Sequence, residues 1–169
     1  NWHFVSRGSP SGLATPPDGT LWAWGYNSSG WLGLGNTTPV SSPVQVGSLT
    51  NWNLIACGGY HTIATKTDGT LWAWGDNVGV GCLGLGDLIS RSSPVQVGTL
   101  TNWNSIAGGY YRTSAIKTDG TLWICGYNGH GELGLNDIIH RSSPVQVGTL
   151  SNWNLIACGR YHTIAKQSY

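Results

Sequence analysis

Charged residues and methionine are scarce in this sequence. Lys, Arg, Asp and Glu together make up 9% of the 169 residues, and Met is absent. Ordinary soluble domains carry roughly a quarter charged residues, and helical bundles need long Ala-, Glu-, Lys- and Leu-rich stretches that this chain lacks. A helical protein is therefore excluded. The near balance of 8 basic and 7 acidic residues also predicts no nucleic-acid partner.

Long hydrophobic runs and clustered cysteines are missing too. The apolar stretches are short and interrupted, which predicts no membrane insertion. The four cysteines lack the CxxC spacing of a zinc site and are too few for a disulfide scaffold. We therefore expect no metal and no cofactor. Since an initiating Met and a signal peptide are lacking, the chain is expected to be either a processed form or a segment of a longer protein.

Glycine and tryptophan are abundant instead. The chain has 26 Gly and 10 Trp, with 40% hydrophobic residues and a formal net charge of +1. Disordered chains have few aromatic residues and a high net charge, so this one is expected to fold. Its length suits one domain or part of one, with enough residues to bury a core.

An internal repeat organises the whole sequence. The pair Asn-Trp begins at Asn1, Asn51, Asn102 and Asn152, in steps of 50, 51 and 50 residues. A fixed period near 50 residues is typical of stacked repeat architectures. We divide the chain accordingly into repeat 1 (1–50), repeat 2 (51–101), repeat 3 (102–151) and the opening strands of a fourth, incomplete repeat (152–169).

Each repeat has the pattern of a small antiparallel sheet. In repeat 2, the β-rich run 55–64 is followed by a turn containing Asp68 and Gly69 and then by the alternating run 70–75, which indicates a hairpin. A Gly-rich loop follows, and Pro94 marks the next run as an outer strand. One such sheet cannot bury both faces by itself. The repeats are therefore predicted to be all-β propeller blades stacked face to face.

The repeats resemble those of the regulator of chromosome condensation family. The resemblance lies in Ala-Cys-Gly-Gly-Tyr-His-Thr (56–62), Asp-Gly-Thr-Leu-Trp-Ala-Trp-Gly (68–75) and Asn-x-x-Gly-x-Leu-Gly-Leu-Gly (27–35). It implies a β-propeller, whose ring takes about seven repeats in that family. Three repeats and a fraction therefore predict a partial propeller arc of about three blades, completed by association with other copies.

The two ends of the repeat array differ. In repeat 1 the opening strand is degenerate, since Pro10, Pro16 and Pro17 remove ladder donors, whereas the fourth repeat keeps its opening run intact. We therefore expect the tail of one molecule to complete blade 1 of another, which gives a filament or a closed ring. A fragment cut from a longer array is the alternative. The residues predicted to make this contact are Asn152, Trp153, Leu155, Ile156, Tyr161, His162, Ile164, Tyr169, Leu21 and Trp22.

No convergent set of catalytic residues stands out, so we expect no enzyme. Asp68 and its two counterparts each precede Gly-Thr, where a short carboxylate supports a turn. His61 and His162 share a repeat position that holds Arg112 in repeat 3, so a catalytic or metal role would lack a consistent partner. The resemblance implies that this histidine packs and hydrogen-bonds between blades.

Two loop residues are candidates for contacts outside the chain. Trp31 takes a loop position that holds Cys82 and Glu132 in the other repeats, where the family commonly has Gln. An extra aromatic on a loop is a candidate anchor for a protein or a sugar, with simple packing as the alternative. Cys82 would bridge two chains in an oxidising medium if its thiol were exposed.

Two sequence patterns bear on the location of the protein. Asn27 and Asn36 each begin the N-glycosylation pattern Asn-x-Ser/Thr. Together with the low charge and the many Gly, Ser and Thr residues, they favour an extracellular or cell-surface setting.

The sequence as a whole predicts a non-enzymatic structural repeat protein that associates with other copies of itself by head-to-tail strand exchange. The alternative is a propeller module whose loops capture another protein. Guanine-nucleotide exchange, the best-known activity of the family, is less favoured, because it depends on a complete ring and on loops that have no match here.

Overall fold

The computed structural model describes residues 4–8 and 11–168, in which strands are joined by turns and loops and no helix is present. The strands form three four-stranded antiparallel sheets and one two-stranded sheet. In the same described ranges, no helix could serve as a membrane span. The prediction of an all-β chain is confirmed, and each four-stranded sheet is one propeller blade.

Each blade uses four consecutive strands, and the strand order in the sheet follows the sequence. Blade 1 comprises β1 (Phe4–Gly8), β2 (Ser11–Thr15), β3 (Trp22–Gly25) and β4 (Val40–Gln45). Blade 2 comprises β5 (Trp52–Cys57), β6 (His61–Lys66), β7 (Leu71–Gly75) and β8 (Arg91–Gln96). Blade 3 comprises β9 (Trp103–Gly108), β10 (Arg112–Lys117), β11 (Leu122–Gly126) and β12 (Arg141–Gln146). The fourth sheet comprises β13 (Trp153–Cys158) and β14 (Thr163–Gln167).

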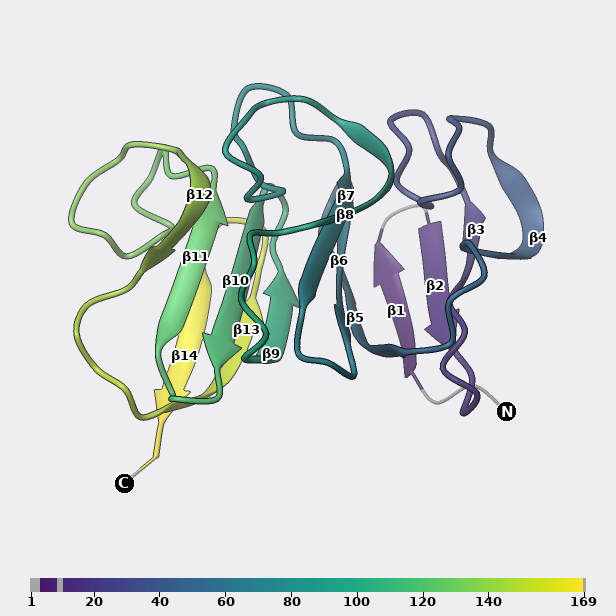
Figure 1. Cartoon of the computed structure of the whole chain (residues 1–169). Coiled ribbons are helices and arrows are strands. Elements are labelled where there is room, and N and C mark those ends of the chain that lie inside the picture. Colours follow the sequence, from purple (N-terminus) through teal and green to yellow (C-terminus); the bar gives the residue numbers. More distant parts are fainter. Residues whose placement is uncertain (1–3, 9–10, 169) are drawn as a thin grey trace.

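The blades stand side by side in an arc (Figure 1). The first strands of successive blades contact one another, β1 with β5, β5 with β9 and β9 with β13, and form the inner edge of the arc. The fourth strands β4, β8 and β12 pair only with the third strand of their own blade and lie at the outer edge. Each of them carries a proline, Pro43, Pro94 or Pro144, as expected of an edge strand.

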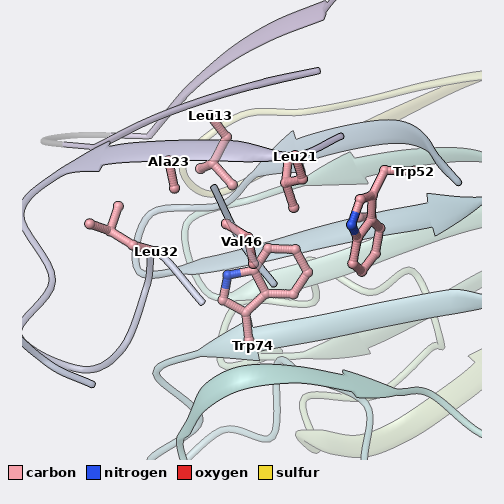
Figure 2. Packing of buried hydrophobic residues seen from close by; sticks show 8 residues of the cluster. Leu13, Leu21, Ala23, Leu32, Val46, Trp52 and Trp74 are labelled. Atoms are coloured by element: carbon pink, nitrogen blue, oxygen red, sulfur yellow. The ribbon is translucent and has the colours of Figure 1, made fainter. Parts of the chain in front are cut away.

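The hydrophobic core lies between blades. In β7, Trp72 and Trp74 pack toward blade 1, whereas Ala73 between them packs toward blade 3, because successive side chains of a strand point to opposite faces. Figure 2 shows the cluster between blades 1 and 2, in which Trp74 is fully buried against aliphatic side chains such as Leu13. Each blade therefore needs its neighbours to cover its two faces.

The Asp-Gly-Thr turns join the second and third strands of the blades, as the sequence predicts. Asp68 Oδ1 accepts hydrogen bonds from the backbone N–H of Thr70 at 3.0 Å and from its hydroxyl at 2.6 Å. These two bonds lower the pKa of the Asp68 carboxyl below its usual range. Gly69 follows with a φ of +77°, a conformation that glycine adopts without strain. The structural role assigned to these aspartates is confirmed.

Blade 1 differs from the expectation drawn from its prolines. β1 pairs with β2 along the whole length of both strands. Pro16 and Pro17 lie beyond the end of β2, where they interrupt no ladder, and Pro10 lies outside the described residues. Blade 1 therefore already has four strands. The expectation that the tail of another molecule completes this blade is wrong.

The incomplete sheet is the fourth. Its strands β13 and β14 pair with each other and have no third strand among the described residues. One face packs on blade 3 through Ile156, which is 7% exposed. The opposite face is open, since Leu155 and Ile164 are 59% and 62% exposed, whereas Ile63, the counterpart of Ile164 in blade 2, is fully buried. Completion of this sheet by another copy stays a prediction.

Replacing Trp74 with Ala tests whether the core lies between blades. Because the indole is fully buried between blades 1 and 2, we expect Trp74→Ala to lower the free energy of unfolding by about 3–5 kcal/mol. Urea denaturation measures the loss. Val78→Ala, at a side chain that is 70% exposed, is the control and should change stability by less than about 0.5 kcal/mol. A Trp74→Ala chain as stable as this control would contradict the arrangement.

Candidate functional site

The turns between the first and second strands of successive blades meet at one end of the inner edge. They carry Tyr60 in blade 2, Tyr110 and Tyr111 in blade 3, and Arg160 and Tyr161 in the fourth sheet. Because β9 contacts both β5 and β13, the turns at the ends of these strands follow one another along the inner edge. We call this surface, together with Tyr127 and His130 of the loop between β11 and β12, the aromatic mouth.

The side chains of the aromatic mouth contact one another across blades. The hydroxyls of Tyr60 and Tyr110 share a hydrogen bond of 2.6 Å, which raises the pKa of Tyr60 to about 12. The ring centroids of Tyr110 and Tyr111 lie 4.7 Å apart, and the guanidinium of Arg160 lies 4.5 Å from the Tyr110 centroid. Such edge-to-face and cation–π pairs hold the rings in place. The aromatic mouth is thus an ordered surface built from three consecutive sheets.

All members of the aromatic mouth except Tyr60 line a cavity of about 760 Å³. This volume falls in the usual range of ligand pockets, about 300–1,000 Å³. Val78 and Val80 add apolar wall, and Asp76 and Arg160 bring charges of opposite sign to the lining. Arg160 is exposed and forms no ion pair within the described part of the chain. The cavity therefore offers aromatic walls beside a guanidinium that has no carboxylate partner there.

The repeated His/Arg position links each blade to the next. The Nε2 atom of His61 lies 3.0 Å from the hydroxyl of Thr113 in blade 3, and burial lowers the pKa of His61 to about 4. The hydrogen bond between blades that the resemblance implied is confirmed for this residue. His162 holds the same position in the fourth sheet and is exposed, because no further blade covers it among the described residues.

Arg112 holds the fourth sheet on blade 3. Its guanidinium is 1% exposed and donates to the backbone carbonyls of Gly159, Arg160 and His162 at 2.9, 3.1 and 2.9 Å. Burial lowers the pKa of this guanidinium. A buried charge is stable only when it is well hydrogen-bonded. Arg112 therefore fixes the turn that brings Arg160 and Tyr161 to the aromatic mouth.

The expectation that Trp31 is an exposed anchor is wrong, and the packing alternative holds. Its side chain is 6% exposed, and its ring lies 5.3 Å from Tyr26 and 5.1 Å from Tyr60. Its carbonyl accepts hydrogen bonds from the hydroxyl of Thr62 and the indole N–H of Trp74. Trp31 therefore joins blade 1 to blade 2 beside the aromatic mouth.

The expectation of an inter-chain disulfide at Cys82 is also wrong. The side chain is fully buried, and its thiol donates to the carbonyl of Asp76 at 3.0 Å. Burial raises the pKa of the Cys82 thiol well above its usual range. A thiol that is both buried and protonated neither reaches a second chain nor reacts readily.

The two glycosylation patterns differ in their surroundings. Asn27 is fully buried, its amide donates to the carbonyls of Asn36 and Thr38, and its Oδ1 accepts from the backbone N–H of Leu32. A glycan on that amide would have no room, so the prediction of a glycan at Asn27 is wrong. Asn36 is exposed, and glycosylation there stays a prediction.

The residues predicted for self-association fall into two groups. Leu21 and Ile156 are buried and Trp153 and Trp22 are partly buried, Ile156 and Trp153 packing on blade 3. The amide of Asn152 donates to the carbonyl of Ser168 in its own sheet. Leu21 and Ile156 are therefore unavailable to another copy. The exposed members are Asn152, Leu155, Tyr161, His162 and Ile164, and Tyr169 lies outside the described residues.

Sequence reasoning missed most of the aromatic mouth. Tyr60, Tyr110 and Tyr111 follow a Gly-Gly pair in their repeats, and Tyr161 follows Gly159 and Arg160. An aromatic residue kept at a turn instead of within a strand is a signal that could have identified the site. The structure brings these turns together, because the blades are side by side. Among residues 4–8 and 11–168, no three His, Cys, Asp or Glu side chains form a potential metal site.

The chain matches known repeats and folds. A family model described as "Regulator of chromosome condensation (RCC1) repeat" matches residues 18–65, 68–116 and 119–165, and a second model with that description matches residues 53–81. The matched units begin at the Asp-Gly-Thr turns, so each one spans parts of two neighbouring blades.

Solved propellers share this architecture. Prp20p from Saccharomyces cerevisiae superposes with a TM-score of 0.85 at 19% identity, over 96% of this chain and 42% of that one. Human WBSCR16 superposes with a TM-score of 0.84 at 24% identity, over 100% of this chain and 45% of that one. The ectodomain of the Physcomitrella patens receptor kinase CR4 gives a TM-score of 0.60 at 17% identity, over 99% of this chain and 38% of that one. The chain spans less than half the length of each.

The buried His61 predicts a pH dependence of stability. Its pKa is about 4 in the fold and about 6.5 in an unfolded chain. The unfolded state therefore binds a proton that the folded state excludes, and stability falls as the pH drops from about 6.5 to about 4. We expect this group to remove about 2 kcal/mol between pH 8 and pH 5. Urea denaturation of the wild type and His61→Gln at both pH values measures it, and equal pH dependence of the two chains would refute it.

Loss of Arg112 should loosen the fourth sheet. Arg112→Ala removes a donor from three carbonyls, of which only that of His162 keeps another in the described part of the chain, the backbone N–H of Gly159. We therefore expect a loss of about 2–4 kcal/mol in the free energy of unfolding and faster proteolysis of β13 and β14. Arg91→Ala is the matched control, because Arg91 forms a partly exposed ion pair with Asp87, which typically contributes less than about 1 kcal/mol. Similar losses in both variants would contradict the assigned role.

Proposed function

Because the chain belongs to the regulator of chromosome condensation (RCC1) repeat family, we propose that it is a protein-binding β-propeller module and that the aromatic mouth is its binding surface. The observation that carries the proposal is the tyrosine-lined cavity of about 760 Å³, where the turns of blade 3 and the fourth sheet meet the β7–β8 loop of blade 2. Tyrosine and arginine are the side chains that most often dominate binding energy at protein interfaces.

The lining favours a particular kind of partner segment. Tyr110 and Tyr127 present aromatic surface to an apolar side chain, and Arg160 provides donors for a carboxylate beside it. The rings already pack against one another, so little side-chain freedom is lost on binding. The partner segment is therefore an extended peptide or a loop with an aromatic or aliphatic residue next to Asp or Glu.

The structural relatives are consistent with a protein partner. Prp20p is described by its binding properties to Gsp1p and histones, and yeast RCC1 (Prp20) is also seen bound to Kap60. Because the likeness to Prp20p is one of fold, it supports the class of partner and no individual partner. Guanine-nucleotide exchange is not part of the proposal, since this chain covers 42% of Prp20p.

Self-association is the second candidate function. It is favoured by the open face of the fourth sheet, where Leu155 and Ile164 are exposed, whereas Ile63, the counterpart of Ile164 in blade 2, is fully buried. Contiguous exposed apolar residues of this kind mark interaction surfaces. Sedimentation velocity at micromolar concentrations tests self-association, because a chain that stays monomeric would refute it.

The proposed extracellular setting depends on a glycan at Asn36, since Asn27 is buried.

Panning a random peptide library on phage tests the aromatic mouth. We expect enriched peptides to pair an aromatic or aliphatic residue with Asp or Glu. Their affinity should fall about tenfold or more for the variant Arg160→Ala/Tyr110→Ala, since both side chains line the cavity. Fluorescence anisotropy of labelled synthetic peptides gives the affinities.

A second double variant controls for nonspecific apolar binding. Leu100 and Leu150 are 45% and 49% exposed and precede the first strands, at the end of the blades opposite to the aromatic mouth. Leu100→Ala/Leu150→Ala should leave peptide affinity unchanged. Peptides that bind the Arg160→Ala/Tyr110→Ala variant as well as the wild type would overturn the assignment, and so would a selection that enriches no peptide.

A further inference from the structure

The interfaces between complete blades share one feature, a third-strand side chain that sits over a glycine of the preceding blade. At Gly33 in blade 1, an added Cβ would lie 2.7 Å from the Trp74 indole nitrogen, and at Gly84 in blade 2 it would lie 3.0 Å from the Cys125 sulfur. Both glycines are buried. The third strand of each following blade thus closes the interface.

The same side chains donate to one carbonyl of the preceding blade. The indole N–H of Trp74 donates to the Trp31 carbonyl at 3.0 Å, and the Cys125 thiol points at the Cys82 carbonyl at 3.7 Å. The Trp31 carbonyl also accepts from the hydroxyl of Thr62, in the strand that pairs with β7. One carbonyl is therefore shared by the second and third strands of the next blade.

Blade 3 presents an equivalent carbonyl and an equivalent glycine, those of Glu132 and Gly134, to the fourth sheet. The contact from the second strand is made, whereas the contacts from a third strand are missing among the described residues. The hydroxyl of Thr163, the counterpart of Thr62, donates to the Glu132 carbonyl at 3.1 Å. Gly134, the counterpart of Gly33 and Gly84, is exposed, and the nearest atom to an added Cβ is a Val147 methyl at 3.7 Å. A cavity of about 340 Å³ lies here, lined by Gly134, Val147 and Trp153 among others.

We propose that the free edge of β14 and the cavity beside Gly134 together bind one further strand of the pattern Thr-Leu-Trp-x-Trp-Gly. The second tryptophan of that strand lies over Gly134 and donates its indole N–H to the Glu132 carbonyl. We call this site the β14 socket. Its cavity shares His130 and Tyr161 with the aromatic mouth, whereas the contacts that support the proposal lie at Gly134, Glu132 and Thr163.

The register of blade 2 defines how the strand lies. There Trp74 is opposite Thr62 and Trp72 is opposite Ala64. In the fourth sheet the two tryptophans of the bound strand would therefore stand opposite Thr163 and Ala165. Thr163 and Ala165 both line the cavity. The first tryptophan then lies near Trp153, as Trp72 lies 6.0 Å from Trp52 in blade 2.

The strand comes from outside these 169 residues. Each third strand of the chain, β3, β7 and β11, is already paired on both sides in its own blade. If one of them left its blade to pair with β14 of a second copy, two strand pairings would be lost and one gained. The favoured occupant is thus an additional strand with the third-strand pattern Thr-Leu-Trp-x-Trp-Gly. It would pack on blade 3 as the third strands of blades 2 and 3 pack on the blades that precede them.

A synthetic peptide with the sequence of residues 66–75, Lys-Thr-Asp-Gly-Thr-Leu-Trp-Ala-Trp-Gly, tests the β14 socket. We expect it to bind the full chain with a stoichiometry of one to one in isothermal titration calorimetry. The same peptide with its second tryptophan changed to Ala should bind about tenfold or more weakly, because it loses the side chain that fills the cavity. Hydrogen exchange of the β14 amides should slow on binding, which apolar adhesion alone would not produce.

Gly134→Asn blocks the β14 socket in the chain itself. Gly134 has a φ of +66°, which Asn tolerates, as Asn136 shows in this chain with a φ of 63°. The variant should fold as stably as the wild type and lose peptide affinity about tenfold or more. Gly98→Asn, at an exposed glycine with a φ of +62° and no atom within 4 Å of an added Cβ, is the matched control.

Three results would overturn the proposal. The peptide does not bind, or it binds Gly134→Asn and Gly98→Asn equally, or the chain forms a dimer whose assembly removes peptide binding. The last result would assign the β14 socket to a second copy of the chain.

Discussion

The fold depends on one constraint: a sheet of four short strands has two faces and cannot cover either of them by itself. Each blade meets the constraint by placing alternate side chains on its two neighbours, as Trp72 and Trp74 do on one side of β7 and Ala73 does on the other. The scarcity of charge follows from the same constraint, since both faces of a blade are buried and charged residues are depleted there. Stability is therefore shared between neighbours along the array.

The proposed binding surface follows from how this stacking places the turns. Blades that contact through their first strands bring the following turns together, and the aromatic residues of those turns become one surface. The buried His61 and Arg112 tie each turn to the next blade, so the position of Arg160 depends on contacts made beneath the aromatic mouth. The fourth sheet has one covered face and one open face. The difference between Ile164, which is exposed there, and Ile63, which is buried in blade 2, shows what a following blade covers.

The repeat period, the Asp-Gly-Thr turns and the outer position of Pro94 could be predicted from the sequence, because each depends on residues close together in the chain. The environments of Trp31, Cys82 and Asn27 could not. Each lies in a loop, and its burial depends on contacts folded over it from its own loop or from the next blade, which a comparison of repeat positions does not reveal. The prolines of repeat 1 misled for a related reason, since Pro16 and Pro17 fall just after the strand they were expected to break.

Hydrogen exchange resolved by strand tests the dependence of each blade on its neighbour most directly. β6 and β10 are covered on both faces and paired on both edges, whereas β14 has one open face and one free edge among the described residues. For the monomeric chain we expect slow exchange in β6 and β10 and exchange at least about tenfold faster in β14. Protection of β14 equal to that of β6 would contradict it.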